Sequence, residues 1–395
     1  MKTINEKLKK LQQDIVGGKP ITLMILGLGS VGTYLLDYLI NLANPKFKIV
    51  VVGRNIDKLQ SDVNIIRTSA TIRRQMASEI VIEANCDLNN VEQIAEVINK
   101  YNPHFIINTS RFYSGLKYGS ISWTNLRAYG IWTPLSVSYA RNIMMAYRMA
   151  QNDAITINTS YSDAVIPWLK SAGLDYFDFG SGNLNHLIPR LKFYIAKKFS
   201  ISDFNKIDVT LAVSHFHDVV ISKEGQTEGQ KILLDVKYKD KTLSFNQEEA
   251  AMACKIAMPT DQKRNMMNAS SNFDIINSII QAINTHTQKK IHTPGVNGEI
   301  GGYPYIFDGT QETIHSSIDT SVFSLESMRK ANAASIYLDG IEKIENGKLY
   351  YTAELQEKVK NVFQVELPRS VGWEDIPKVT DFLIENIIKS KVLSK

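Results

Sequence analysis

Short apolar runs alternate with amphipathic segments along the first 160 residues. The runs cover residues 23–26, 49–52, 79–84, 105–108 and 154–158, and each has the length of a buried strand. Helices are expected between and before them, at residues 5–13, 61–78 and 134–151 and directly after Asn90. The segment after the first run repeats apolar residues every three or four positions, the spacing of one helix face: Tyr34, Leu35, Tyr38, Leu39 and Leu42. This alternation predicts an α/β fold with a doubly wound parallel sheet.

The pattern changes near residue 205. Residues 209–214, 231–238 and 242–245 have strand patterns with no helix between them, so we expect a largely antiparallel sheet. Further helices are expected at residues 247–256, 266–285, 324–338 and 374–390, with a hairpin at 341–351 around Asn346-Gly347. We therefore predict a Rossmann-like, dinucleotide-binding domain over residues 1–160 and an α+β substrate and dimerisation domain over 161–395, whose C-terminal helices pack back on the first domain.

A glycine-rich turn joins the first predicted strand to the first amphipathic helix. It reads Gly27-Leu-Gly29-Ser-Val-Gly32. In such a turn the first glycine permits the sharp change of direction, the second lets a pyrophosphate approach the backbone, and the third lets the helix pack closely on the strand. The free N–H groups and the positive dipole end of the helix then face the phosphates. The turn and its context predict a dinucleotide-binding βαβ unit.

The tip of the second predicted strand distinguishes between nicotinamide cofactors. NAD-binding proteins usually carry an acidic residue there for the ribose 2′-hydroxyl, whereas an arginine accommodates a 2′-phosphate. This chain has Arg54 between Gly53 and Asn55, and its first acid comes only at Asp57. Charge complementarity therefore favours NADP(H) over NAD. The alternative is that Arg54 is a solvated loop cation and Asp57 contacts the ribose.

Other cofactor contacts are expected at the carboxyl ends of the remaining parallel strands, where ligands of such sheets bind. Asp87 is expected at the adenine edge, with capping of the next helix as its alternative role. Thr109 is expected along the nicotinamide ribose. The complete set of predicted cofactor-binding residues is Gly27, Gly29, Ser30, Val31, Gly32, Gly53, Arg54, Asn55, Lys58, Asp87, Leu88, Thr109 and Ser110.

A histidine pair is the first candidate for proton transfer, which hydride chemistry requires from the protein. His215 and His217, followed by Asp218, come at the end of a predicted strand. Alternation along a strand places both imidazoles on one face, and imidazole titrates near neutral pH. We assign the pair to a proton relay rather than to a metal site. The alternative is that one histidine packs in the sheet and the other lies on the surface.

A second candidate site follows the fifth predicted strand. Tyr161 and Asp163 are placed there to touch a substrate, unless Asp163 or Ser162 only caps the following helix. A substrate carboxylate would need a cation, and guanidinium groups bind carboxylates bidentately. Arg111 is the best placed, because it follows the fourth predicted strand directly; the arginines considered are Arg111, Arg127, Arg141 and Arg190.

Composition narrows the class of protein. The chain has 395 residues, 44% of them hydrophobic and 22% charged, with a net charge of +5, which is too small and dispersed to indicate nucleic-acid binding. The two cysteines, Cys86 and Cys254, form no pairing or zinc-binding pattern and fit a reducing compartment. The N-terminus lacks the apolar core of a signal peptide, and no stretch approaches 18 uninterrupted apolar residues. We expect a soluble, cytoplasmic protein without membrane partners.

Residues 20–190 resemble the saccharopine dehydrogenase-like reductases. The matching parts are LMILGLGSVGTYL, the GRN after the second run, CDLNNVEQI after the third, and NTSYSDAVIPWLKSAGL after the fifth. The resemblance implies NAD(P)H-dependent reduction of an imine formed between an amine and a 2-oxo acid, or the reverse oxidation. We therefore predict an NADP(H)-dependent oxidoreductase that acts on a small polar substrate and forms a homo-oligomer, namely a homodimer. The alternatives are a lyase or synthase that recycles a tightly bound nicotinamide, and a non-catalytic dinucleotide sensor.

Overall fold

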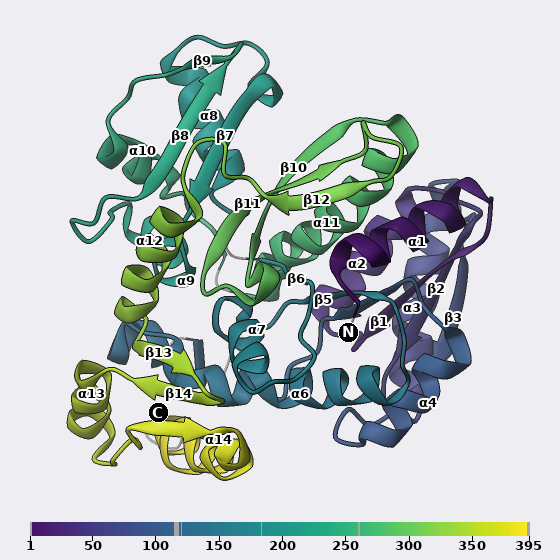
Figure 1. Ribbon diagram of the computed structural model, residues 1–395. Helices are drawn as coiled ribbons and strands as arrows, with labels where there is room; N and C mark the ends of the chain where they lie inside the picture. Colours follow the sequence, from purple (N-terminus) through teal and green to yellow (C-terminus); the bar gives the residue numbers. More distant parts are fainter. Residues whose placement is uncertain (1, 114–117, 120, 183, 260, 393–395) are drawn as a thin grey trace.

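A six-stranded parallel sheet forms the centre of the N-terminal half (Figure 1). The computed structural model describes residues 2–113, 118–119, 121–182, 184–259 and 261–392. The strands run in the spatial order β3-β2-β1-β4-β5-β6, and every neighbouring pair is parallel. Their bounds are β1 Ile21–Leu26, β2 Phe47–Val52, β3 Glu79–Glu83, β4 Phe105–Asn108, β5 Ile155–Asn158 and β6 Phe179–Gly180. This order confirms the predicted doubly wound, Rossmann-like sheet.

Helices cover both faces of the sheet. Alternation along β1 shows why: Leu23 and Ile25 belong to one apolar cluster, whereas Met24 and Leu26 belong to the other. The first cluster includes α2, α3 and α11, and the second includes α4, α6 and α7. The helix bounds are α1 Ile4–Val16, α2 Ser30–Asn41, α3 Ile56–Ile72, α4 Val91–Tyr101, α6 Thr133–Met149, α7 Ser162–Ser171 and α11 Asn265–Thr285.

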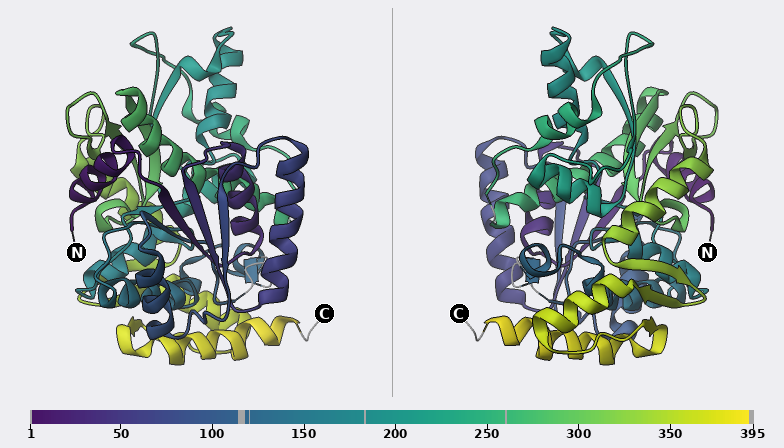
Figure 2. Two further views of the ribbon diagram at one scale, coloured as in Figure 1. Left: turned by 90° about the vertical axis from the view of Figure 1, so that its right-hand side faces the viewer. Right: turned by 90° about the vertical axis from the view of Figure 1, so that its left-hand side faces the viewer.

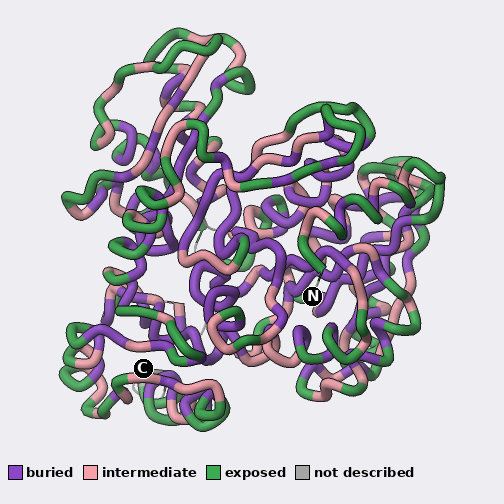
Figure 3. Tube along the Cα trace, in the orientation of Figure 1, coloured by how far each residue is buried: buried purple, intermediate pink, exposed green. Residues whose placement is uncertain are grey.

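Three antiparallel sheets of three strands each complete the chain. The first contains β7 Ile207–Ala212, β8 Leu233–Tyr238 and β9 Lys241–Thr242; the second β10 Gln288–Pro294, β11 Gly302–Asp308 and β12 His315–Ile318; the third β13 Ile341–Glu345, β14 Lys348–Tyr351 and β15 Ser370–Gly372. The remaining helices are α8 Ile188–Lys198, α9 His215–Glu224, α10 Gln247–Cys254, α12 Leu325–Leu338, α13 Ala353–Phe363, α14 Ile376–Leu383 and α15 Lys389–Val392. In Figure 3, buried residues concentrate in the central sheet and in the strands next to it.

Two expectations for the region after residue 205 are wrong. A helix, α9, does separate β7 from β8, and it starts after Ser214 and ends at Gly225 with φ of 73°. A serine before and a glycine after an apolar segment are helix boundary signals, so the sequence contained this information. The expected set of strands also lacks β10 and β11, which form an antiparallel hairpin. Pro294 and Pro304 obscured these strands, because proline cannot donate a hydrogen bond to a sheet.

The C-terminal segment lies against the N-terminal half. Ile376, Val379 and Leu383 of α14 are buried in the same apolar cluster as α6, and Figure 2 shows this segment (yellow) along the lower edge of the molecule. The hairpin β13–β14 before it turns at Asn346 and Gly347, which have φ of 50° and 72°. These left-handed conformations confirm the predicted Asn-Gly turn. None of the described helices is long and apolar enough to cross a membrane.

Candidate active site

A cleft of about 980 Å³ opens at the carboxyl ends of β1, β2 and β4. Its outer half is lined by the glycine turn after β1 and the loop after β2. Its inner half is lined by residues of α8, α9 and the N-terminal end of α11. Sequence reasoning predicted the first half from local motifs. The second half is assembled from elements of the antiparallel region.

The three glycines of the turn have three different surroundings. Gly27 has φ of +90°, and a Cβ there would lie 3.0 Å from the Cβ of Ser110. A Cβ on Gly32 would lie 2.3 Å from the carbonyl oxygen of Gly27, a contact that no side chain tolerates. A Cβ on Gly29 would meet no atom within 4 Å. Gly27 and Gly32 are therefore needed for the fold of the turn, whereas Gly29 keeps the cleft side open for a ligand.

Hydrogen bonds fix the turn against its neighbours. The hydroxyl of Thr109 donates to the carbonyl oxygen of Gly27 at 2.6 Å. From the opposite wall, the Asn265 side-chain amide at the start of α11 donates to the Ser30 hydroxyl at 2.6 Å. The first turn of α2, with its free N–H groups, is thus held facing the cleft.

Arg54 lies on the cleft wall at the end of β2, as expected for a group near the cofactor ribose. It is exposed and lines the cleft together with Asn55 and Lys58. The side-chain oxygen of Asn55 caps α3 by accepting from the Lys58 backbone N–H at 2.9 Å. Asp57 is not among the described residues that line the cleft. The cationic group is therefore on the cleft side of this loop and the carboxylate is not.

Asp87 does not line the cleft among the described residues, in contrast to the expected adenine contact. Its neighbours Cys86 and Leu88 do. The Asp87 Oδ1 accepts from the backbone N–H and the side-chain amide of Asn89, both at 3.0 Å. The helix α4 is capped by Asn90 rather than by Asp87. The side chain of Asp87 is thus used to shape the turn after β3, an Asx-turn role that sequence spacing does not distinguish from ligand binding.

Of the other predicted cofactor contacts, all but Gly32 line the cleft. Gly32 lies behind the cleft wall, packed against Gly27 and the Thr109 side chain. The remaining predicted residues line the cleft: Gly27, Gly29, Ser30, Val31, Gly53, Arg54, Asn55, Lys58, Leu88, Thr109 and Ser110. The loops that the parallel sheet was expected to bring together are therefore brought together, with Asp87 as the exception.

His215 is the titratable centre of the inner half. It is the first residue of α9, it lines the cleft, and it is 9% exposed. Its imidazole Nδ1 lies 2.7 Å from Oδ2 of Asp339. Its backbone N–H donates to Oδ1 of Asp163 at 2.9 Å. Asp339 orients the ring through Nδ1 and Asp163 holds the backbone, so Nε2 is the ring nitrogen available for exchange with a ligand.

Asp339 collects hydrogen bonds from three separate parts of the chain. Its Oδ2 accepts from the Tyr161 hydroxyl at 2.7 Å as well as interacting with His215. Its Oδ1 accepts from the Tyr129 backbone N–H at 2.7 Å. The tyrosine rings pack on the imidazole, with centroids 4.7 Å away for Tyr129 and 5.0 Å away for Tyr161. A carboxylate with this many donors fixes both its own orientation and that of the histidine.

Tyr161 and Asp163 contact His215 but do not line the cleft among the described residues. Tyr161 has φ of 44° and is 5% exposed, so a bulky side chain is held in a left-handed conformation. Such strain persists only where the surrounding structure imposes it, and it clusters at functional sites. These two residues support the histidine and are not placed for direct contact with substrate.

Electrostatics favour a protonated His215. Burial lowers the pKa of its imidazole, but the neighbouring carboxylates of Asp339 and Asp163 outweigh that effect and the pKa lies above its ordinary value of 6.5. Burial raises the pKa of Asp163 to about 6, against the opposing charge of His215. Burial raises the pKa of Tyr129 and of Tyr161 well above 10, so both phenols remain neutral at pH 7.

His217 does not share the face of His215. The segment is helical, and residues two positions apart on a helix point in different directions, so the predicted alternation is wrong. The Nδ1 of His217 lies 2.7 Å from the Ser335 hydroxyl and its Nε2 lies 3.1 Å from the Thr227 carbonyl oxygen. Burial lowers its pKa. Both ring nitrogens are used within the core, away from the residues that line the cleft.

Sequence reasoning missed Asp339, Tyr129 and two cations of the inner half. Asp339 is 124 positions from His215 in the sequence. It lies between α12 and a glycine, where an acid is usually only part of a surface turn. Lys223 and Arg264 line the cleft as well. Of the four arginines considered as ligands for a substrate carboxylate, Arg111 and Arg190 line the cleft. Arg111 is exposed and comes shortly after β4.

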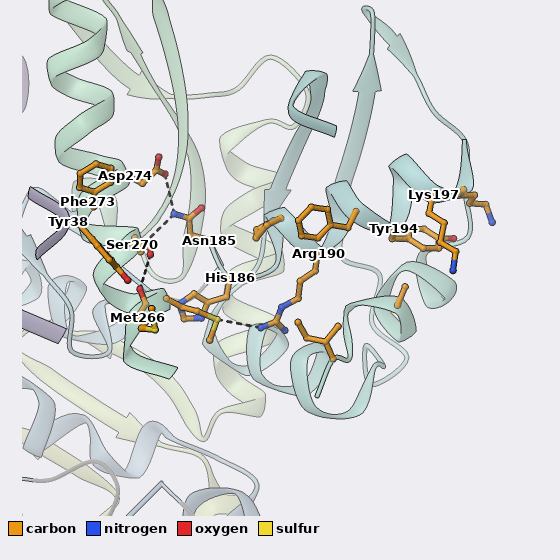
Figure 4. A pocket seen from close by; sticks show the side chains of 17 residues that line it. Tyr38, Asn185, His186, Arg190, Tyr194, Lys197, Met266, Ser270, Phe273 and Asp274 are labelled. Carbon is orange, nitrogen blue, oxygen red and sulfur yellow. Dashed lines mark hydrogen bonds between the residues drawn. The ribbon is translucent and has the colours of Figure 1, made fainter. Parts of the chain in front are cut away.

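A second cavity, of about 1180 Å³, adjoins the cleft between α8, α10 and α11. His186, Arg190 and Met267 line both. Figure 4 shows the Arg190 side chain extending past His186 with its guanidinium beside a methionine sulfur. The two cavities therefore meet at a buried cation.

Comparison with known proteins places the fold but not a family. No protein-family model and no curated protein sequence matches the chain. Among solved structures, a lactate dehydrogenase from Cryptosporidium parvum, complexed with lactic acid and nicotinamide adenine dinucleotide, has a TM-score of 0.51 at 14% identity and covers 81% of this chain and 98% of its own. A malate dehydrogenase from Aeropyrum pernix has a TM-score of 0.49 at 13% identity, covering 80% and 97%. The likeness to the lactate dehydrogenase supports the Rossmann-like fold alone, and none of these matches confirms the saccharopine dehydrogenase-like resemblance.

Proposed function

We propose that this protein is an NADP(H)-dependent oxidoreductase that acts on a small polar substrate, such as an amino acid, an oxo acid or the imine between them. The observation that carries the proposal is the position of His215, backed by Asp339, in the same cleft as the glycine turn of Gly27 to Gly32. A phosphate-binding turn and an oriented, titratable imidazole are the two parts that a nicotinamide enzyme needs from its protein.

The residues of the outer half fit a dinucleotide. The open space at Gly29 and the first turn of α2 would hold the pyrophosphate, and Thr109 and Ser110 would lie along the nicotinamide ribose. The guanidinium of Arg54 would meet the 2′-phosphate of NADP(H). When bound, the cofactor supplies or accepts the hydride.

The residues of the inner half would handle the proton. With Nδ1 directed at Asp339, the imidazolium of His215 donates a proton from Nε2 to the substrate oxygen or nitrogen during reduction, and accepts it during oxidation. Asp339 stabilises the charged ring and fixes its orientation, and Tyr161 in turn fixes Asp339. Arg111, which lines the cleft beside Tyr129, is the candidate for contact with a substrate carboxylate.

Calorimetric titration with NADPH and NADH tests the cofactor assignment. We expect the wild type to prefer NADPH and the variant Arg54→Asp to bind NADPH at least about tenfold more weakly, because a carboxylate would repel the 2′-phosphate. The variant Arg74→Asp, at an exposed position outside the cleft lining, is the matched control with the same change of charge. Equal affinities for both cofactors, unchanged in Arg54→Asp, would contradict the assignment.

Absorbance at 340 nm tests the reaction class. With NADPH and a panel of 2-oxo acids, amines and their mixtures, we expect oxidation of the cofactor that depends on His215. Tightly bound cofactor with product formation but no net absorbance change would instead support a lyase or synthase. Cofactor binding without turnover on any member of the panel would support a dinucleotide sensor. The division into two domains and the homodimer remain predictions that sedimentation and limited proteolysis can test.

A further inference from the structure

The inner half of the cleft contains three cations for which no carboxylate partner is found among the described residues. Arg190 lies on α8, Lys223 on α9 and Arg264 just before α11, and all three line the cleft. Buried or partly buried charges are normally paired, because removing a charge from water is costly. Arg190 is buried, Arg264 is half-buried and Lys223 is exposed at the same wall, so the two less exposed guanidinium groups indicate an absent anionic partner, to which Lys223 adds a third charge.

Arg190 is the most deeply placed of the three, at 6% exposed. Its Nη1 donates to the Ser222 hydroxyl at 2.7 Å and to the Cys254 carbonyl oxygen at 3.2 Å. Its Nη2 faces the sulfur atoms of Met258 and Met267, at 3.2 and 3.8 Å. Thioether sulfurs are weak acceptors, so the guanidinium keeps the capacity to bind an oxyanion.

Lys223 and Arg264 extend the same charged surface. The ammonium of Lys223 lies 5.0 Å from the centroid of the Trp123 ring, and the buried Nε of Arg264 has no hydrogen-bond partner in the described structure. The charge of Arg264 acts on Lys223: partial burial and, after it, Arg264 lower the pKa of that lysine. The three cations therefore share one local field rather than three separate ones.

The nearby acids do not neutralise this group. Asp218 lies on the cleft wall, but its Oδ1 accepts from the Leu184 backbone N–H and its Oδ2 lies 3.6 Å from Nδ1 of His186. Asp261 is exposed and its Oδ1 accepts from the Lys263 backbone N–H at 2.8 Å. Even with both acids ionised, the positive charges are in excess.

The helix α9 sets the distance between the cations and the proposed proton-transfer residue, His215. His215, Asp218, Val219 and Ser222 all line the cleft, and their spacing of three, four and seven positions is that of one helix face. Ser222, which holds Arg190, is two turns beyond His215, an axial separation of about 10 Å. An anion at Arg190 would thus lie several bonds away from a carbon that reacts next to His215.

We propose that Arg190, Lys223 and Arg264 bind an anionic group, carboxylate or phosphate, at the far end of an elongated substrate. This inference rests on the proposed function, since it assumes that the reacting carbon lies at His215. It adds a substrate class: chain-like acids or phosphate esters whose anionic group is several bonds from the carbon that accepts the hydride. A substrate as short as a three-carbon hydroxy acid would not span the two sites.

Calorimetry without turnover tests the anion site. The full-length protein is saturated with NADPH and titrated, at constant ionic strength, with inorganic phosphate and with glutarate. We expect both to bind, and Lys223→Gln and Arg264→Gln each to weaken binding about fivefold to tenfold, in line with loss of a charge-assisted contact. Lys263→Gln, an exposed neighbour outside the cleft lining, is the matched control and should bind as the wild type does.

Two outcomes would overturn the proposal. If neither anion binds the NADPH-saturated protein, or if all three variants bind equally, the cations do not form an anion site. If phosphate binds only without NADPH and competes with it, the cations serve the cofactor phosphates and not a substrate. This measurement needs no hydride transfer, so it can be interpreted even if no turnover is seen at 340 nm. A failure of the anion site and a failure of the oxidoreductase proposal can therefore be distinguished. Arg190 itself is tested with Arg190→Lys, because this replacement keeps the buried charge and is less disruptive to folding than a neutral one.

Discussion

The two halves of the cleft are built in opposite ways. The outer half is a local structure: six consecutive residues, from Gly27 to Gly32, provide the turn, and Arg54 follows on the next strand. The inner half is assembled at long range. Asp339 is 124 positions from His215 and 178 positions from Tyr161, and it forms a hydrogen bond with each of them. A short motif is therefore enough to form a phosphate-binding turn, whereas the surroundings of the histidine depend on the whole fold.

The two halves also differ in what stabilises them. In the outer half, the decisive feature is space: a missing Cβ at Gly32 allows the helix to pack on the turn, and a missing Cβ at Gly29 leaves room for a ligand. In the inner half, the decisive feature is charge compensation, with Asp339 satisfying an imidazolium, a phenol and a backbone N–H. Changes in one half should therefore leave the function of the other intact.

Replacement of His215 should give the largest effect and confine it to the inner half. We expect His215→Asn to lower kcat/KM by about 10²- to 10⁴-fold, the usual contribution of general acid–base catalysis. The affinity for NADPH should stay within about twofold, because the glycine turn is untouched. Steady-state kinetics and calorimetry on the same preparation measure both. A parallel loss of cofactor binding would show that the two halves are not independent.

Alanine substitutions in the glycine turn should separate folding from binding within the outer half. Gly32→Ala places a Cβ 2.3 Å from a backbone oxygen and should lower the free energy of unfolding by about 1–3 kcal/mol. Gly29→Ala meets no atom within 4 Å and should leave stability unchanged while weakening NADPH binding. Urea unfolding and calorimetric titration of both variants check this. Equal destabilisation by the two substitutions would argue against distinct roles.

Replacement of Asp339 should change the pH dependence of both activity and stability. The pKa of His215 lies above 6.5 in the folded protein, so its protonation stabilises the fold fully below about pH 6.5, and this stabilisation is lost as the pH rises through the raised value. In Asp339→Asn we expect the pKa of His215 to fall and the alkaline decline in reductive kcat/KM to move to lower pH. Profiles of kcat/KM and of unfolding free energy between about pH 5.5 and 9 measure this. An unshifted profile would remove Asp339 from the mechanism.

Replacement of His217 should give the smallest functional effect and serves as the control for His215. Because both of its ring nitrogens are engaged within the core, His217→Gln should cost about 1–3 kcal/mol of stability through unsatisfied partners. We expect kcat/KM to change by less than about threefold, since no cleft contact is lost. Thermal unfolding and steady-state kinetics test it. A loss of activity equal to that of His215→Asn would restore the proton relay that the sequence suggested.

Much of the outer half was predictable from the sequence. Gly27, Gly29 and Gly32 occupy the three environments that their spacing indicated, and the loops after β2 and β4 line the same cleft. Asp87 was misplaced, because a ligand contact and an Asx-turn have the same sequence signal. The prediction of His217 failed for a different reason: a strand pattern was assigned to a helix, so the residues expected on one face lie on different ones.

The parallel sheet, the glycine turn and the cation after β2 could be predicted without the structure, because each depends on the periodicity or the backbone freedom of neighbouring residues. The groups that surround His215 became apparent from the folded chain alone. The Asp339 carboxylate reaches His215 from the end of α12, and the Arg190 guanidinium reaches the cleft from α8; their separation along the chain carries no record of that proximity. Charges are compensated in space, whichever segment delivers the partner, and that is why the chemistry of the inner half appears only when the chain is folded.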